Sequence, residues 1–414
     1  MRISICFALA VGAGAAVLPD CSGSQAPMGA PGTMPQSATI VPAGKILDHV
    51  QTAASYKVLY NFGKPQHDAA IPTAGLIEVK GTLYGTTTRG GAYGGGTVFS
   101  VSTAGKEEVI YNFGGGSDGY DCMASLIDVE GTLYGTTAGG GKYGGGTVFS
   151  ITTTGTKHIL HNFGTAIGTD GSDPEASLIY VNGTLYGTTA AGGGPHGKLG
   201  GGTVFSISTT GTERVLYRFR GRFNGIIPMG GLIDVNNTLY GTTSLGGAYH
   251  QGTVFSVTMA GQEHLLYSFR GNTDGSDPEA SLIDVNGVLY GTAVGGGKNY
   301  HGTVFSITTA GNLDVLHRFD GSPDGANPFA SLIDVKGVLY GTTEQGGTYP
   351  YSYPHYGTVF STSTTGRERV VHSFGSGSDG NYPAASLIDV RGTLYGTTEN
   401  GGRYNAGTVF ELRP

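Results

Sequence analysis

The tetrapeptide Leu-Tyr-Gly-Thr occurs seven times in this chain of 414 residues, about once every 50 residues. A repeat of this period is typical of solenoids, arrays and propellers, in which each unit buries its apolar face against its neighbours. The repeat therefore constrains the fold, and it implies that most repeated residues serve the architecture. The copies begin at Leu83, Leu133, Leu185, Leu239, Leu289, Leu339 and Leu394.

Each repeat contains four segments with the composition of short strands. We call them A, B, C and D; in the second repeat they are residues 125–129, 132–137, 146–151 and 158–163. They are rich in Val, Ile, Thr, Tyr and Phe and are bounded by Gly, Asn or Asp, as strands are. No stretch after the N-terminus has a sustained helical period. The repeat therefore predicts an all-β propeller with four antiparallel strands per blade.

The two ends of the repeat region predict a closed ring. The first segment, 56–62, is a D segment with no A, B or C before it, and the last repeat stops after its C segment, 407–412. We expect a seven-bladed β-propeller in which the N-terminal strand 56–62 joins the C-terminal three strands, because closure removes exposed strand edges. An open β-solenoid is the alternative. Small residues at the start of each A segment place it innermost, and the Phe of each Thr-Val-Phe, such as Phe99, should pack between blades.

The residues before the repeats predict export. Residues 1–20 combine one arginine, a short apolar run and small residues, as a secretory signal peptide does. Cys21 stands where a lipoprotein carries its lipid, and residues 21–55 form a Gly/Ser/Pro-rich tether before the propeller at 56–414. Asp20 departs from the small residue that usually precedes such a cysteine, so cleavage after Ala15 and simple secretion stay open. The expected location is the outer membrane or cell surface as a lipoprotein, or the medium.

Composition limits the partners. The net charge is −7 with 23 basic residues and no basic run, so we expect no nucleic-acid partner. Membrane contact is expected only through a lipid at Cys21, and the chain is expected to be a monomer. With Cys6 removed and Cys21 lipidated, Cys122 has no partner for a disulfide. We interpret Cys122 as a tolerated substitution in a turn.

The repeat resembles a known family. Its form, Ala-Ser-Leu-Ile-Asp-Val-x-Gly-x-Leu-Tyr-Gly-Thr-Thr-x-x-Gly-Gly followed by Gly-Thr-Val-Phe-Ser-Ile, is similar to the GloVer tandem repeat of bacterial surface or secreted proteins, over residues 56–412. The resemblance implies an exported protein with a propeller and a variable anchor. It implies no activity and no catalytic residues.

One face of the ring is the candidate binding surface. The A-to-B and C-to-D turns are short, so all length variation lies in the B-to-C and D-to-A loops, which share a face in an antiparallel blade. Exposed tyrosines there offer flat apolar area and a hydroxyl at little entropic cost. The alternative is that each tyrosine packs on its own glycine loop. The candidate ligand-binding residues are His196, Tyr249, Tyr300, His301, Tyr349, Tyr351, Tyr353, His355, Tyr356 and Tyr404.

Acidic and histidine residues of the repeat are interpreted as structural. Asp-Gly pairs in the D-to-A loops are typical of turns, with a calcium site as the alternative. The acidic residues that end the A segments, such as Asp128, should accept hydrogen bonds from turn amides. The D-segment histidines His161, His317 and His372 alternate with tyrosine and should pack. We therefore expect no metal site and no cofactor, apart from that calcium alternative.

The sequence favours a non-catalytic exported propeller that binds a glycan, a peptide or a partner protein through this face. An enzyme acting on polysaccharide or peptide is the second hypothesis, with Glu175, Glu279 and Asp277 as its acids. The two glutamates hold equivalent repeat positions, whereas a catalytic pair needs two different environments. A structural surface module is the third hypothesis. No catalytic residue is assigned.

Overall fold

The computed structural model describes residues 54–64, 68–165, 169–194, 200–221, 223–348, 356–375 and 378–414. Residues from Thr52 onward form one compact unit. The expected signal peptide and Cys21, and all of the tether up to residue 53, lie outside the described residues. Within the described ranges the only helix is a single 3-10 turn, Gly116–Asp118, and no helix has the length and apolar character needed to cross a membrane.

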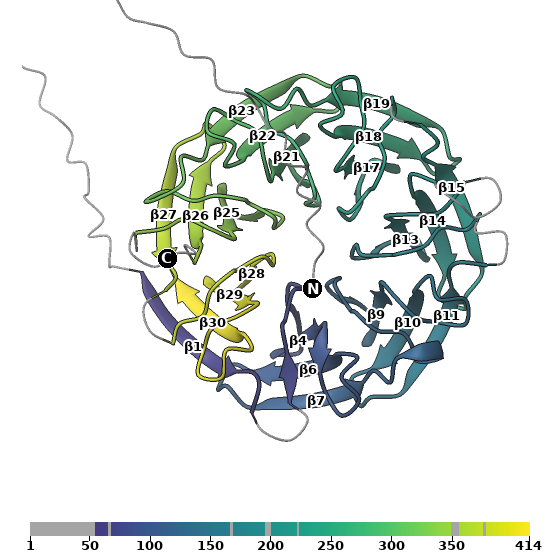
Figure 1. Ribbon diagram of the computed structural model, residues 1–414, viewed down its shortest axis with the longest axis vertical. Coiled ribbons are helices and arrows are strands. Elements are labelled where there is room, and N and C mark those ends of the chain that lie inside the picture. The colour runs from purple at the N-terminus through teal and green to yellow at the C-terminus, as the bar shows by residue number, and fades with distance from the viewer. Residues whose placement is uncertain are drawn as a thin grey trace, which may run out of the picture. The chain divides into compact units, whose positions relative to one another are not determined.

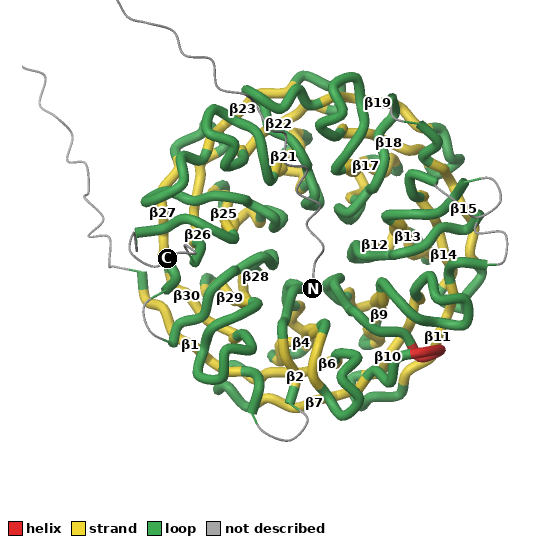
Figure 2. Tube along the Cα trace, viewed as in Figure 1, coloured by secondary structure: helices red, strands yellow, loops and turns green. Residues whose placement is uncertain are grey.

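Seven four-stranded antiparallel sheets form a ring, as the sequence predicted (Figures 1 and 2). In the second repeat the strands lie within two residues of the predicted segments. Blades 1 to 3 consist of β3 (Ile77–Val79), β4 (Thr82–Thr87), β6 (Thr97–Ser102) and β7 (Glu107–Asn112); β8 (Ile127–Val129), β9 (Thr132–Thr137), β10 (Thr147–Thr152) and β11 (Lys157–Asn162); and β12 (Ile179–Val181), β13 (Thr184–Thr189), β14 (Thr203–Ser208) and β15 (Glu213–Arg218).

Blades 4 to 6 repeat the same order, from the innermost strand to the outermost. They consist of β16 (Ile233–Val235), β17 (Thr238–Thr243), β18 (Thr253–Thr258) and β19 (Glu263–Ser268); β20 (Ile283–Val285), β21 (Val288–Ala293), β22 (Thr303–Thr308) and β23 (Leu313–Arg318); and β24 (Ile333–Val335), β25 (Val338–Thr343), β26 (Thr358–Ser363) and β27 (Glu368–Ser373).

Blade 7 closes the ring with the two ends of the chain. It contains β28 (Ile388–Val390), β29 (Thr393–Thr398), β30 (Thr408–Arg413) and, as its outermost strand, β1 (Ser55–Asn61). Figure 1 shows purple β1 beside yellow β30, and Val58 pairs with Phe410 in the antiparallel register. The predicted closure by the N-terminal strand is therefore confirmed, and the open solenoid is excluded.

A threonine hydroxyl joins each blade to the next near the axis. Thr86 in β4 donates to the carbonyl of Ala124 over 3.0 Å, and Thr397 in β29 donates to Ala74 over 3.2 Å across the point of closure. The acceptor is always the small residue just before the innermost strand, where the blades converge. The same hydrogen bond occurs at all seven junctions, so the threonine of each Leu-Tyr-Gly-Thr copy links its blade to the next.

Phenylalanines fill the space between blades, as predicted. Phe113, which follows β7, meets Phe149 of β10 edge to face at a centroid distance of 5.4 Å, and both are fully buried. Tyr84 of blade 1 packs into the same cluster. Cys122, interpreted from the sequence as a tolerated substitution in a turn, is a buried free thiol that packs in this cluster.

The hairpins on the opposite face follow the expected turn chemistry. Lys80 and Gly81 both have positive φ, 52° and 86°, as a two-residue type I′ turn requires. Asp128 accepts a 2.9 Å hydrogen bond from the Gly131 amide, and Asp284, Asp334 and Asp389 do the same in their blades. The predicted role of these carboxylates in capping turns is therefore confirmed.

Candidate functional site

The B-to-C and D-to-A loops form one continuous layer on a single face of the ring. β2 (Ala69–Ala70), in the loop that enters blade 1, pairs with β5 (Arg89–Gly90) in the B-to-C loop of that blade. Single bridges repeat this pairing in the other six blades, as between Ile226 and Leu245 in blade 4. Backbone hydrogen bonds between the loops therefore hold this surface in a defined conformation.

A residue in a left-handed conformation fastens this layer at each junction. Ile227, at φ 62°, donates its N–H to Gly201 of blade 3 over 2.7 Å and accepts from Ser244 of blade 4 over 3.0 Å. Branched side chains are strained at positive φ, so the two hydrogen bonds hold an unfavourable backbone conformation. All of the equivalent residues except Asp121, which precedes Cys122, stand before a proline. They are Ile71, Asp121, Asp173, Asp277, Asn327 and Tyr382.

Tyrosines of the B-to-C loops project from this layer. Tyr93, Tyr143, Tyr249, Tyr300 and Tyr404 have exposed fractions of 73%, 45%, 52%, 69% and 38%. A ring that packed fully on its own loop would expose far less, so packing alone does not account for them. Tyr349, Tyr351, Tyr353, His355 and His196 lie outside the described residues.

Three of the predicted ligand-binding residues differ from the remaining tyrosines in backbone position or in burial. Tyr300 has φ 61° and occupies the left-handed position that His250 holds in blade 4, so Asn299 is the counterpart of Tyr249. His301 is partly buried beside Gly321. Tyr356 is partly buried against the cluster between blades 6 and 7.

Basic side chains lie over three of the exposed rings. The ammonium of Lys142 is 5.1 Å from the centroid of Tyr143, the guanidinium of Arg270 is 5.9 Å from that of Tyr249, and the guanidinium of Arg403 is 5.4 Å from that of Tyr404. Each pair offers an aromatic face beside a cation. Blades 2, 4 and 7 thus present the same combination of groups around the ring.

A pocket of about 100 Å³ lies on the axis of the ring, where the D-to-A loops enter the innermost strands. Its wall consists of the residues that precede the innermost strands, including Glu175 and Glu279. These two glutamates hold equivalent positions in blades 3 and 5, whose counterparts in other blades include Thr73, Met229 and Phe329. The pocket therefore contains two carboxyl groups in equivalent positions, whereas a catalytic acid and base need two different environments.

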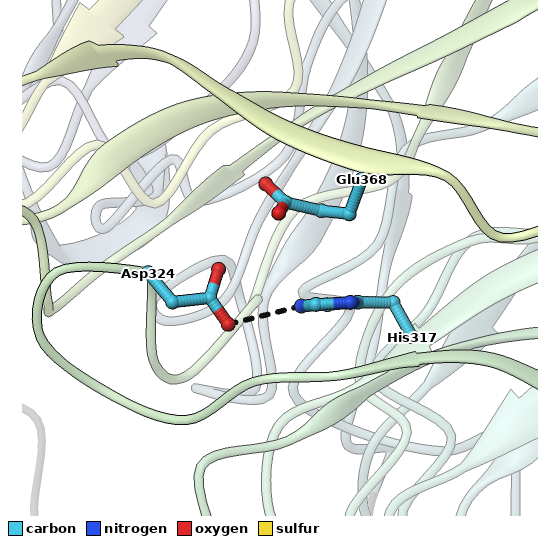
Figure 3. A group of neighbouring side chains, drawn as sticks. All are labelled: His317, Asp324 and Glu368. Carbon is cyan, nitrogen blue, oxygen red and sulfur yellow. Dashed lines mark hydrogen bonds and ion pairs between the residues drawn. The ribbon is translucent and has the colours of Figure 1, made fainter. Parts of the chain in front are cut away.

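A second set of polar clusters lies at the outer edge of the ring, and it was missed in the sequence. At every junction three groups meet: the next-to-last residue of one outermost strand, the Asp or Asn of the following loop, and a residue at the start of the next outermost strand. That last residue is the first of its strand, except in β1, where it is the second, Tyr56. His317 of β23, Asp324 and Glu368 of β27 make one such cluster (Figure 3). The others are Tyr60, Asp68 and Glu107; Tyr111, Asp118 and Lys157; His161, Asp170 and Glu213; Tyr217, Asn224 and Glu263; Tyr267, Asp274 and Leu313; and His372, Asp379 and Tyr56.

The loop carboxylates in these clusters act first as turn caps. Asp118 accepts from the Gly114 amide over 2.8 Å and from the Tyr111 hydroxyl over 2.9 Å. Burial would raise the pKa of Asp118, but these bonds and the Lys157 ammonium outweigh burial and lower it. The turn interpretation of Asp-Gly is therefore supported. The D-strand histidines do more than pack, because they contact these carboxylates.

The cluster between blades 5 and 6 brings its three ligand-type side chains together. Nε2 of His317 is 3.0 Å from Oδ2 of Asp324, and one ligand atom from each of the three residues lies within 4.8 Å of the others. Oδ1 of Asp324 and Oε1 of Glu368 are buried without a hydrogen-bond partner. Burial, and next the Asp324 carboxylate, raise the pKa of Glu368 to about 7. Two carboxyl groups thus share this small space with one imidazole.

The first residue of the outermost strand decides the charge of each cluster. Lys157 places its ammonium 2.7 Å from Asp118, with only 3% of its side chain exposed. Glu107 holds the same position beside Asp68, and burial, with that carboxylate adding, raises the pKa of Glu107 to about 7. The sequence signal was the alternation of Lys, Glu, Leu and Tyr at this one repeat position. This alternation could not be interpreted from the sequence, because the side chains that it contacts belong to the preceding blade.

Comparison with known proteins agrees with this architecture. No curated protein matches the chain. Among solved structures, an ancestral GH74 enzyme is 12% identical over 84% of this chain and 48% of that chain, with a TM-score of 0.56. Puromycin hydrolase is 11% identical over 84% of this chain and 54% of that chain, with a TM-score of 0.52. This chain spans about half of each, and the likeness shows the fold alone.

The sequence itself identifies the family. The model of the Gloeobacter/Verrucomicrobia repeat matches residues 42–250 and 195–410 in two overlapping stretches, which cover most of the propeller. This agrees with the resemblance seen in the seven copies of Leu-Tyr-Gly-Thr and their flanking segments. The chain belongs to the Gloeobacter/Verrucomicrobia repeat family.

Proposed function

We propose that this propeller is an exported, non-catalytic module that binds an extended glycan through the layer of B-to-C and D-to-A loops. The observation that carries the proposal is the set of exposed tyrosines on a loop layer fixed by hydrogen bonds. Tyr93, Tyr249 and Tyr300 each expose more than half of their surface. Rigid aromatic anchors bind sugar rings at a low entropic cost, because little motion is lost on binding.

The paired cations refine the ligand class. Lys142, Arg270 and Arg403 each stand over an exposed tyrosine. A polymer with carboxylate or sulfate groups between its sugar rings would meet both kinds of group at once. A peptide or a protein partner is the alternative ligand, and a structural module without a ligand is the other alternative.

The proposal includes export, with the chain anchored by a lipid at Cys21 or released after cleavage. Metabolic labelling with a fatty acid tests the anchor. Label in the wild type that is absent in Cys21→Ser supports lipidation, and an unlabelled wild type in the medium supports secretion.

The binding proposal is tested with the full chain on arrays of neutral and acidic glycans. Tyr93→Ala with Tyr249→Ala should weaken binding at least about tenfold, since truncating one interface anchor costs 1 kcal/mol or more. Tyr180→Ala is the matched control, because Tyr180 is an exposed tyrosine of β12 near the opposite face. An array without any bound glycan, with a protein captured through the same tyrosines, would move the proposal to a protein ligand.

A catalytic role has less support. It rests on Glu175 and Glu279, which line the axial pocket at equivalent positions. Turnover of a glycan by the wild type that disappears in Glu279→Gln would establish it against the binding proposal.

A further inference from the structure

We propose that His317, Asp324 and Glu368 form a binding site for one divalent transition-metal ion, of which Zn²⁺ is the best example, at the junction between blades 5 and 6. The site lies at the outer edge of the ring, between the outermost strands β23 and β27. Only Asp324 belongs to the loop layer, and the exposed tyrosines of the proposed glycan surface take no part in the site. It does not depend on the proposed function.

The first argument is the donor geometry. An imidazole nitrogen and two carboxylates come from three elements, β23, the loop after it and β27, and face a common point (Figure 3). Ligand atoms around a tetrahedral ion lie roughly 3.3 Å apart, given metal–ligand distances of about 2.0–2.2 Å. His317 and Asp324 already lie near this spacing at 3.0 Å, and the ligand atom of Glu368 is within 4.8 Å of both, a separation that a rotation of its side chain can shorten.

The second argument is the buried atoms without a partner. Oδ1 of Asp324 and Oε1 of Glu368 are shielded from solvent and accept no hydrogen bond. A buried carboxylate oxygen without a donor is costly, and a cation between the two oxygens removes that cost. In the corresponding cluster between blades 2 and 3, Oε1 of Glu213 is also buried without a partner, but the Thr165 hydroxyl donates to Oδ1 of Asp170 over 2.9 Å. Within the described part of the ring, both carboxylates hold a buried oxygen without a donor only at the junction with His317.

The third argument comes from the other junctions of the same molecule. The position of Glu368 is held by Lys157 between blades 1 and 2, where its ammonium lies 2.7 Å from the loop carboxylate. The chain therefore supplies a cation of its own at one copy of this place. Between blades 4 and 5 the position is Leu313, which adds no second charge. Two junctions combine an imidazole and two carboxyl groups without such a cation, those of His161 and His317. Among the described residues, only the junction with His317 brings one ligand atom of each side chain within 4.8 Å of the others.

The donor types select the metal. Imidazole together with carboxylates is typical of Zn²⁺ and its neighbours in the transition series. Calcium takes six to eight oxygen ligands, which one imidazole and two carboxyl groups do not provide. A bound ion would link blades 5 and 6 and therefore stabilise the folded ring.

The experiment is a calorimetric titration of the untagged full chain with ZnCl₂, together with its melting temperature with and without Zn²⁺. The repeat supplies two variants that suit the fold. His317→Tyr places the tyrosine found at four equivalent positions, and Glu368→Lys places the lysine found at position 157. We expect each variant to fold, to lose one bound Zn²⁺ per chain, or to bind it at least about a hundredfold more weakly, and to lose the Zn²⁺-dependent rise in melting temperature.

His161→Tyr is the matched control, because it makes the same change in the cluster between blades 2 and 3. It should leave the stoichiometry and affinity of the site unchanged. A wild type that shows no heat and no thermal shift at millimolar Zn²⁺ overturns the proposal. Zn²⁺ binding that is equal in the wild type, His317→Tyr and Glu368→Lys also overturns it, and Ca²⁺ binding with a higher affinity than Zn²⁺ overturns the choice of metal.

Discussion

Replacing Lys157 by methionine removes a buried cation from the junction between blades 1 and 2. The ammonium contacts Oδ1 and the backbone carbonyl of Asp118, both at 2.7 Å. It also lies 5.0 Å from the ring centroid of Phe113 and 5.5 Å from that of Phe149. Methionine fills a similar volume but offers neither the charge nor the donors. The change therefore isolates the electrostatic part of the contact.

The expected loss of unfolding free energy is about 2–3 kcal/mol. Breaking a fully buried ion pair costs about 3–5 kcal/mol, because one charge stays behind without a partner. Asp118 stays 27% exposed and keeps its bonds from Gly114 and Tyr111, so the expected loss lies just below this range. The cation–π contacts are part of the same loss and are not added separately.

Urea unfolding at pH 7 and at pH 3 measures the effect. The folded pKa of Asp118 is below its ordinary value, so its pairing stabilises the protein above the ordinary pKa of about 3.9 and loses this effect as the pH falls through the folded pKa. The difference between the wild type and Lys157→Met should therefore shrink in acid. Lys106→Met, at an exposed site just before β7, is the control and should stay within about 0.5 kcal/mol. A loss below about 1 kcal/mol at pH 7, or one that is equal at both pH values, refutes the reasoning.

Three further predictions concern stability. Glu107→Gln should stabilise the protein by about 1–2 kcal/mol at pH 8 and have little effect at pH 4.5. The raised pKa of Glu107 means that the folded state favours the protonated acid, so the stability of the wild type falls as the pH rises toward 7, less steeply where solvent screens the carboxylate. Urea unfolding at both pH values checks this. Ile227→Asn should raise stability by about 1 kcal/mol in thermal unfolding, since asparagine tolerates φ 62° and keeps both backbone bonds; a lower melting temperature contradicts this. Deletion of 55–61 should abolish the single cooperative melting transition, because blade 7 loses β1; an unchanged transition contradicts the closure.

Much of the loop face could be predicted from the sequence. The lengths of the B-to-C and D-to-A loops placed them on the variable face, and the exposure of Tyr93 and Tyr249 agrees with that placement. The register of single residues could not be predicted. Tyr300 follows two glycines as Tyr249 does, yet it stands one residue farther from them, in a left-handed position. The two loops have the same length, and the residue two before the closing glycine is left-handed in both, His250 in one and Tyr300 in the other. Only the structure showed that this position is left-handed.

The sequence by itself determined the ring, through the period of Leu-Tyr-Gly-Thr, the strand composition and the unmatched D segment at the N-terminus. Six blades pair residues that are close in the chain, and the unmatched D segment occupies the place left open in the seventh. Only the tertiary structure decided which side chains meet between blades. His317 and Glu368 stand in different repeats and belong to strands that do not pair, and Lys157 reaches Asp118 in the same way. The strand pattern does not encode these contacts, because they depend on how far each blade turns against the next.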